Sequence, residues 1–146
     1  MDYKKEVIDK LRCYTAKRES LRWSAEEIRR LESELCSIRS ATSDGIPVSG
    51  GTNVREDRLI NNIALREEMA ASQKRTREWL HVMDGVLGQL DPEEFRILDL
   101  MYIRREKGNV ELLCDELNIE KNTVYYRKDK ALRHFAIILY GEESSQ

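Results

Sequence analysis

Two adjacent tyrosines stand among basic side chains in the stretch KNTVYYRKDKALR, residues 121–133. This stretch has five basic residues and one acidic residue, a net charge of +4. Residues 91–120, just before it, have nine acidic and four basic residues, a net charge of −5. In a chain with a net charge of −2, positive charge concentrated in one segment indicates a surface that can contact phosphates and bases. The alternative interpretation is an ordinary amphipathic helix whose lysines are solvated.

An α-helix turns by about 100° per residue, which sorts these side chains onto two faces. With Val124 directed inward, Ala131, Phe135 and Ile138 share its side and continue into the apolar run FAIILY. The predicted outer face holds Asn122, Tyr126 and Arg133, with Thr123 and Lys130 beside them, Tyr125 and Arg127 on the flanks, and Lys128 nearer the inner edge. Most of the basic side chains are therefore expected to be exposed.

The residues before this helix fit a tight turn between two crossed helices. The segment VELLCDEL predicts a short helix, and Asn118 follows where the chain needs a left-handed residue, a place that asparagine fills best after glycine. The positions expected of a helix-turn-helix are occupied by Leu113, Cys114, Asn118, Ile119 and Val124. Small Cys114 lets the two helices approach, and Val124 anchors the second helix.

In a recognition helix the first residues reach deepest into the major groove. The predicted base contacts are therefore Lys121, Asn122, Tyr125 and Tyr126. An asparagine such as Asn122 suits an adenine, because its amide can donate and accept at once. The predicted phosphate contacts are Thr123, Arg127, Lys130 and Arg133. The predicted partner is double-stranded DNA.

Patterns for catalysis or metal binding are missing from the sequence. His81 and His134 stand far from the three scattered cysteines, Cys13, Cys36 and Cys114, which lack metal-ligand spacing. No nucleophile motif or phosphate-binding loop is found. We predict no enzymatic activity, no metal and no cofactor. An odd number of scattered cysteines, with no export signal and no apolar span, predicts a cytoplasmic protein without membrane contact.

The composition predicts an all-α fold. Of 146 residues, 36% are charged, and two prolines and seven glycines leave long uninterrupted stretches. Apolar residues at steps of three and four predict helices over about residues 3–40 and 55–90, joined by a Gly-rich loop at 41–54. We expect these helices to form a long antiparallel hairpin, residues 1–90, for oligomerisation or partner binding.

The apolar surface that the hairpin leaves uncovered needs either the C-terminal domain or a second subunit. Because one chain is not expected to cover both apolar stripes, a homodimer is predicted. The second helix has a polar middle, SQKRTRE, which fits either a solvated face or a contact surface for DNA or a partner.

Residues 91–141 are predicted to form the helix-turn-helix domain, followed by a flexible tail at 142–146. Asp91 and Pro92 suit the start of its first helix. The predicted apolar stripe of this helix is Phe95, Leu98, Met101 and Tyr102, flanked by Ile97 and Leu100. Lys107-Gly108 is expected to end that helix and Asn109 to cap the next. Gly141 is expected to end the last helix.

The segments LDPEEFRILDLMYI and NVELLCDELNIEKNTVYYRKDKALRHF together resemble region 4 of bacterial sigma factors, which recognises the promoter −35 element. The shared features are the L-x-P-x-E entry, the short helix ending in E-L-x-I, the T-V pair, and KALRHF, which is similar to the family's K-A-L-R-x-L ending. A helical hairpin followed by such a domain is similar to small phage-encoded regulators of the ArpU and RinA type from Gram-positive hosts. The resemblance implies a transcriptional regulator of late phage genes in a bacterial host, with host RNA polymerase as a further partner.

The sequence also departs from this family pattern. Asn118 replaces the usual glycine, Glu120 stands where a Ser or Thr cap is common, and no region 2-like segment is present. A complete sigma factor is therefore not expected. Two alternatives remain open, namely a DNA-packaging protein similar to a small terminase subunit, and a module that docks on RNA polymerase without reading DNA.

Overall fold

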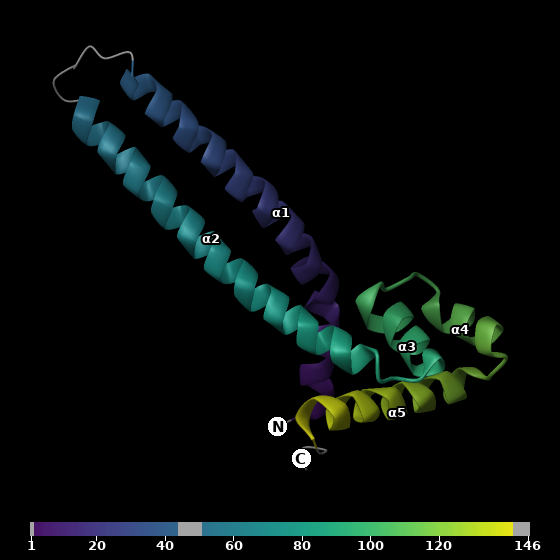
Figure 1. Cartoon of the computed structure of the whole chain (residues 1–146). Coiled ribbons are helices and arrows are strands. Elements are labelled where there is room, and N and C mark those ends of the chain that lie inside the picture. Colours follow the sequence, from purple (N-terminus) through teal and green to yellow (C-terminus); the bar gives the residue numbers. More distant parts are fainter. Residues whose placement is uncertain (1, 44–50, 142–146) are drawn as a thin grey trace. The chain divides into compact units, whose positions relative to one another are not determined.

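The computed structural model describes residues 2–43 and 51–141, and the regular secondary structure in these ranges is helical throughout. The elements, shown in Figure 1, are α1 (Tyr3–Ser43), α2 (Gly51–Leu87), α3 (Pro92–Leu98), the π-helix η1 (Asp99–Ile103), α4 (Asn109–Leu117) and α5 (Lys121–Tyr140). The prediction of an all-α fold is confirmed. None of the described helices combines the length and the apolar character that a membrane span requires.

The two long helices are shared between two compact units. The middle unit is Arg18–Glu78, and the terminal unit combines Met1–Lys17 with Trp79–Gln146. This division differs from the boundary predicted at residue 90. The physical reason is that Leu11 of α1 and Met83 of α2 pack in one apolar core with side chains of α5. The N-terminal part of α1 and the C-terminal part of α2 therefore belong with the C-terminal helices.

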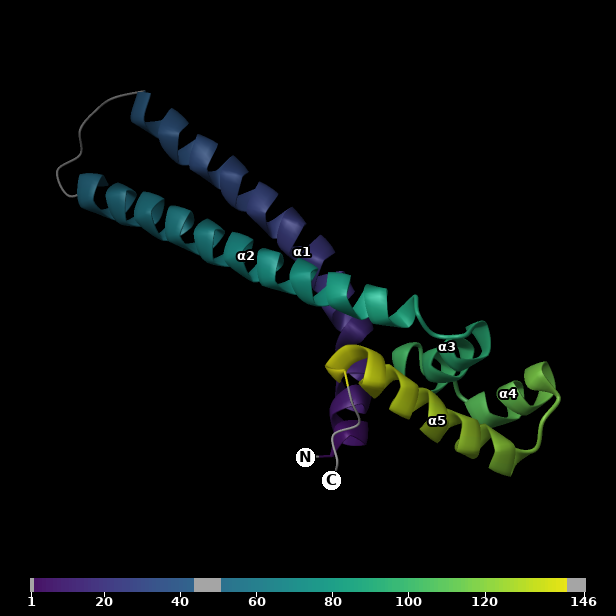
Figure 2. The same cartoon turned by 60° about the horizontal axis from the view of Figure 1, so that its bottom comes forward.

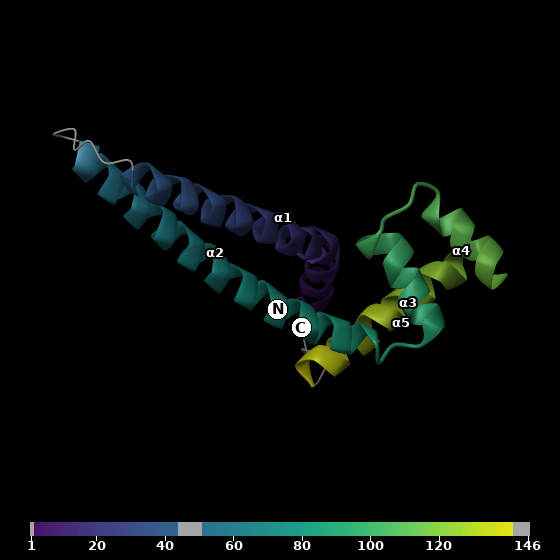
Figure 3. The ribbon, with the colours of Figure 1, turned by 45° about the horizontal axis from the view of Figure 1, so that its top comes forward.

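In the middle unit, α1 and α2 lie side by side in all three views of the chain (Figures 1, 2 and 3). The buried apolar side chains of α1 in this unit are Leu31, Leu35 and Ile38. From α2 come two buried amides. Asn62 Nδ2 donates to the Leu31 carbonyl at 2.8 Å, and Gln73 Nε2 donates to the Ser24 hydroxyl at 2.9 Å. Because a buried amide must find partners, these bonds fix how α1 and α2 align.

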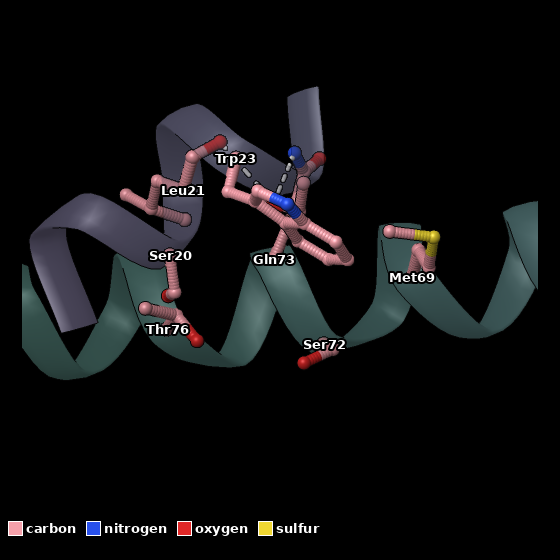
Figure 4. A pocket seen from close by; sticks show the side chains of 8 residues that line it. Ser20, Leu21, Trp23, Met69, Ser72, Gln73 and Thr76 are labelled. Carbon is pink, nitrogen blue, oxygen red and sulfur yellow. Dashed lines mark hydrogen bonds between the residues drawn. The ribbon is translucent and has the colours of Figure 1, made fainter. Parts of the chain in front are cut away.

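The polar stretch SQKRTRE is partly buried and partly exposed, so neither interpretation of the sequence fits all of it. Gln73 is only 8% exposed, so a fully solvated face is wrong at this residue, whereas Lys74, Arg75 and Glu78 are exposed as that interpretation expects. Figure 4 shows Gln73 and Trp23 at a hollow of about 200 Å³. Its other lining residues are Ser20, Leu21, Ser24, Met69, Ser72 and Thr76. Small and polar side chains thus interrupt the apolar contact between α1 and α2.

The long helices extend further into the predicted loop than expected. Of the loop at 41–54, residues 41–43 and 51–54 are helical, and residues 44–50 lie outside the described residues. A glycine costs a helix only about 1 kcal/mol, so Gly51 does not prevent α2 from beginning there. At its other end α2 stops at Leu87 instead of residue 90. The N–H groups of Gln89 and Leu90 bond carbonyls three residues back, which tightens the chain into a turn.

The terminal unit holds two apolar cores. The larger core joins α1, α2, α3 and α5, and among its fully buried side chains are Val7, Leu11, Met83, Leu98, Leu132 and Phe135. The smaller core joins α3, η1, α4 and α5, and its buried members are Ile97, Leu100, Val110, Leu113 and Val124. Figures 2 and 3 show α3, α4 and α5 grouped together, with a short connection between α4 and α5.

The helix α3 buries Leu98 of the predicted stripe and its flank, but not Phe95. Phe95, placed by the sequence in an apolar stripe, is 38% exposed, whereas Ile97 and Leu98 are fully buried. Ile97 packs in the smaller core and Leu98 in the larger one. Because α3 contacts two cores, its buried surface is wider than one stripe, and Phe95 falls outside it.

The connection between α3 and α4 also differs from the prediction. The helix becomes a π-helix at Asp99 and ends at Ile103, before the predicted Lys107-Gly108. Gly108, with φ of 71°, takes the N-cap position predicted for Asn109. The Asn109 amide instead donates to the Leu100 carbonyl at 3.2 Å, so this side chain satisfies the end of the preceding element.

The turn after α4 has the predicted left-handed residue. Asn118 has φ of 54°, and its N–H bonds the Cys114 carbonyl. We expect Asn118→Ala to lower the free energy of unfolding by roughly 1–2 kcal/mol, because a Cβ without a local polar partner is strained in this region. Asn118→Gly should retain or slightly raise stability. Urea denaturation of both variants measures the difference, and an equal loss in both would contradict a purely conformational role.

Candidate nucleic-acid interface

The helix α5 presents the four predicted base contacts on its first two turns. Lys121 and Asn122 are exposed in the first turn, and Tyr125 and Tyr126 follow with 39% and 70% of their surface exposed. Glu120 precedes the helix in extended conformation and gives it no side-chain cap. This part of α5 therefore offers an amide, an ammonium group and two phenols to a partner.

The opposite face of α5 holds the helix in place. Val124, Ala131 and Phe135 are fully buried and Ile138 is partly buried, so the predicted inner face is confirmed. Val124 packs in the smaller core and Phe135 in the larger one. Because both ends of α5 are anchored in different cores, the exposed side chains sit on a firmly supported helix.

The four side chains predicted to contact phosphates differ in their exposure and in their ion pairs. The Arg127 guanidinium forms an ion pair with the Glu93 carboxylate of α3, so part of its charge is already neutralised. Lys130 and Arg133 are exposed, whereas Thr123 is half-buried. Lys130 forms no ion pair within the described part of the chain. No local pattern could have predicted the Arg127 pair, since 34 residues separate its partners.

Acidic side chains border one side of α5. A hollow of about 390 Å³ lies between α3 and α5, and its lining residues are Asp91, Glu93, Glu94, Ile97, Tyr126, Arg127 and Lys130. Carboxylates so close to Lys130 and Tyr126 oppose the approach of a polyanion from this direction. A polyanion that contacts Lys130 or Tyr126 is therefore expected to approach from outside this hollow.

Glu94 links the start of α3 to α5. The Asp91 N–H donates to Glu94 Oε1 at 3.0 Å, which forms half of the capping box at Asp91. His134 Nδ1 lies 2.9 and 3.1 Å from the two oxygens of the same carboxylate, so Nδ1 carries the proton of these bonds. The prediction of a helix start at Asp91 is confirmed, and its acidic first turn also positions α5.

Near this surface, Lys128 and Glu116 each interact with neighbouring side chains. Lys128 lies 5.4 Å from the centre of the Tyr125 ring and 3.6 Å from the Asp129 carboxylate, which fits its predicted place at the inner edge. On α4, Glu116 accepts two hydrogen bonds from Arg96, at 2.9 and 2.7 Å. The hydrogen bonds from Arg96 hold the pKa of Glu116 below its ordinary value.

The outer surface of α4 is acidic. Glu111, Asp115 and Glu116 are exposed there, and Leu112 between them is 42% exposed. A helix with this charge repels phosphates. The side chains suited to nucleic acid are therefore concentrated on α5, in its first two turns and at Lys130 and Arg133.

Among the described residues, no group of three histidine, cysteine, aspartate or glutamate side chains is placed to hold a metal ion. Comparisons with protein-family models, curated proteins and solved structures found no match to this chain. The chemistry of the α5 surface is therefore the basis on which a function can be inferred.

Proposed function

We propose that this protein is a sequence-specific DNA-binding regulator of transcription that reads the major groove with α5. The observation that carries the proposal is the exposed set of Lys121, Asn122, Tyr125 and Tyr126 on the first two turns of a helix whose other side is fully buried. Side chains at the start of such a helix can reach base edges, and asparagine and lysine are among the residues that read them.

The connection between α4 and α5 supports a helix-turn-helix arrangement. A left-handed Asn118 separates the helices, and Leu113 and Val124 meet in the smaller core. Both features are expected of this motif. Together with the resemblance to region 4 of sigma factors, they favour a regulator of the phage-encoded type, with host RNA polymerase as a further proposed partner. The long helices α1 and α2 would then form the antiparallel hairpin for self-association.

The charges around α5 limit how much of the protein can touch the phosphate backbone. With α4 acidic and Arg127 paired to Glu93, the strongest candidate for a phosphate contact is Lys130, and Arg133 is exposed further along the helix. Few phosphate contacts give a shallow dependence of affinity on salt. The specificity would then depend on the base contacts at the start of the helix.

The test begins with DNA fragments of phage or bacterial genomes retained by the purified protein, which identify a binding site. On that site, Asn122→Ala should cost roughly 1–3 kcal/mol of binding free energy and change little on scrambled duplexes. Lys130→Ala should weaken binding to both duplexes and lower the salt slope by roughly one. Titrations at several salt concentrations separate these two outcomes.

Arg127→Ala is the matched control for Lys130→Ala, because both changes remove one positive charge from neighbouring turns of α5. Its effect on DNA affinity should be smaller, since Glu93 already neutralises part of the Arg127 charge. If Ala replacements at Arg127, Lys130 and Arg133 together left DNA affinity unchanged in a folded protein, DNA binding by α5 would be refuted. The same surface would then fit a protein-docking module.

A further inference from the structure

One face of α2 in the middle unit is left uncovered. Ile60 is 62% exposed, and Ala64 and Ala71 are exposed as well. At about 100° per residue, Ile60 and Ala64 lie within about 20° of the direction of Ala71, so the three form one stripe. The buried amides Asn62 and Gln73 lie about 160–180° from Ala71 and contact α1. The stripe is therefore opposite the side of α2 that packs on α1.

Charges of opposite sign flank the middle of this stripe. Glu67 and Glu68 precede Ala71, and Lys74 and Arg75 follow it, all exposed. None of the four forms an ion pair within residues 2–43 and 51–141. Measured from Ala71, Glu67 and Lys74 are rotated to one side by about 40–60°, and Glu68 and Arg75 by the same amount to the other.

This order of charges is complementary to itself when the helix direction is reversed. We propose that a second copy of this chain docks on the face, with its α2 antiparallel and the two-fold axis near Ala71. At 1.5 Å per residue, Glu67 lies about 6 Å before the axis and Lys74 about 4.5 Å after it. The two-fold therefore brings Glu67 to the same height, within about 1.5 Å, as Lys74 of the partner subunit, and on the same side of the contact.

The same operation places Glu68 opposite Arg75 of the partner subunit on the other side of the contact. Each pair occurs twice, as an isologous interface requires. The small side chain of Ala71 at the centre allows the helix axes to approach to about 8 Å, the close end of the usual range. A parallel partner in register would instead place Glu67 against Glu68 of the partner subunit and Lys74 against Arg75 of the partner subunit, and repulsion between like charges opposes that arrangement.

The interface should be weak and sensitive to salt. A contact along one helix face lies at the small end of specific interfaces. Its ion pairs are at the rim, where each contributes little and salt screens it. We expect a dimer in ~50 mM salt at protein concentrations on the order of 100 µM, and mostly monomer in ~500 mM salt.

Charge reversal of the full chain, followed by sedimentation equilibrium, tests this interface. The acid-reversed variant, Glu67→Lys with Glu68→Lys, should be monomeric, because four positive charges on each copy then face each other. The base-reversed variant, Lys74→Glu with Arg75→Glu, should be monomeric for the converse reason. An equimolar mixture of the two variants should form a heterodimer, since each supplies the charges that the other repels.

Glu26→Lys with Glu32→Lys is the matched control, because it makes the same change in net charge at exposed positions of α1. This control should dimerise like the unaltered chain. Ala71→Arg should abolish the dimer while circular dichroism stays helical, since arginine favours a helix and Ala71 is exposed.

Monomeric behaviour of the unaltered chain in ~50 mM salt would overturn the proposal. A dimer that survives both reversals, or variants that fail to pair when mixed, would overturn it equally. The interface does not depend on the function of α5, so loss of DNA binding in a protein that still dimerises contradicts only the function proposed above.

Discussion

Val124→Asp should destabilise the terminal unit more than any other single change at the α4–α5 contact. Val124 is fully buried in the smaller core, together with Ile97, Leu100 and Leu113. Its neighbours there are apolar, so an aspartate would be left without a partner for its charge. An unpaired buried charge costs roughly 3–5 kcal/mol, a large part of the stability of a small domain. We expect α4 to detach from α5 and the helical signal to melt at a much lower temperature.

Cys114→Ala is the control for this change. Cys114 is only partly buried against the same core, and alanine preserves a small apolar side chain at the close contact. Its effect should be below about 1 kcal/mol. Thermal melting followed by circular dichroism compares the two variants. The reverse order of stability would show that Val124 does not anchor α5 in this core.

Arg104→Ala should also be strongly destabilising, although the arginine itself is exposed. The carboxylate of Asp99 is 2% exposed and accepts hydrogen bonds from Arg104 at 3.0 and 2.5 Å. The nearest other cation is Arg96, 3.8 Å away. A buried carboxylate that loses its partner is costly, whereas removal of both partners is often nearly neutral. Arg96 should retain part of the stabilisation, so the loss should be large but incomplete.

A double-mutant cycle separates this effect from a general loss of charge. Asp99→Asn added to Arg104→Ala should recover much of the stability, because no buried charge then remains. Arg105→Ala, one residue along and exposed, should change the unfolding free energy little. Urea unfolding of the four proteins gives the coupling between Asp99 and Arg104. Additive losses would show that the two side chains act independently.

The sequence predicted those features that depend on neighbouring residues. The all-α fold, the helix start at Asp91, the left-handed turn at Asn118 and the helix end at Gly141 all agree with the structure. The division of α5 into a buried and an exposed side also follows from its 3.6-residue period. Backbone geometry and helix capping act within about four residues, so the chain carries these signals locally. For the candidate site, this local pattern predicted the exposure of Asn122, Tyr126, Lys130 and Arg133, whereas Thr123 is half-buried.

Only the tertiary structure decided which partner each side chain meets. Arg127 pairs with Glu93 and Gln73 bonds Ser24 across gaps of 34 and 49 residues, and no local pattern links such positions. Phe95 is exposed because α3 contacts two cores instead of one, which a single apolar stripe does not indicate. The free energy of these contacts depends on the packing of distant segments. The sequence by itself therefore determined the helices and the two faces of α5, and tertiary packing decided the buried face of α3 and the ion pair that Arg127 forms.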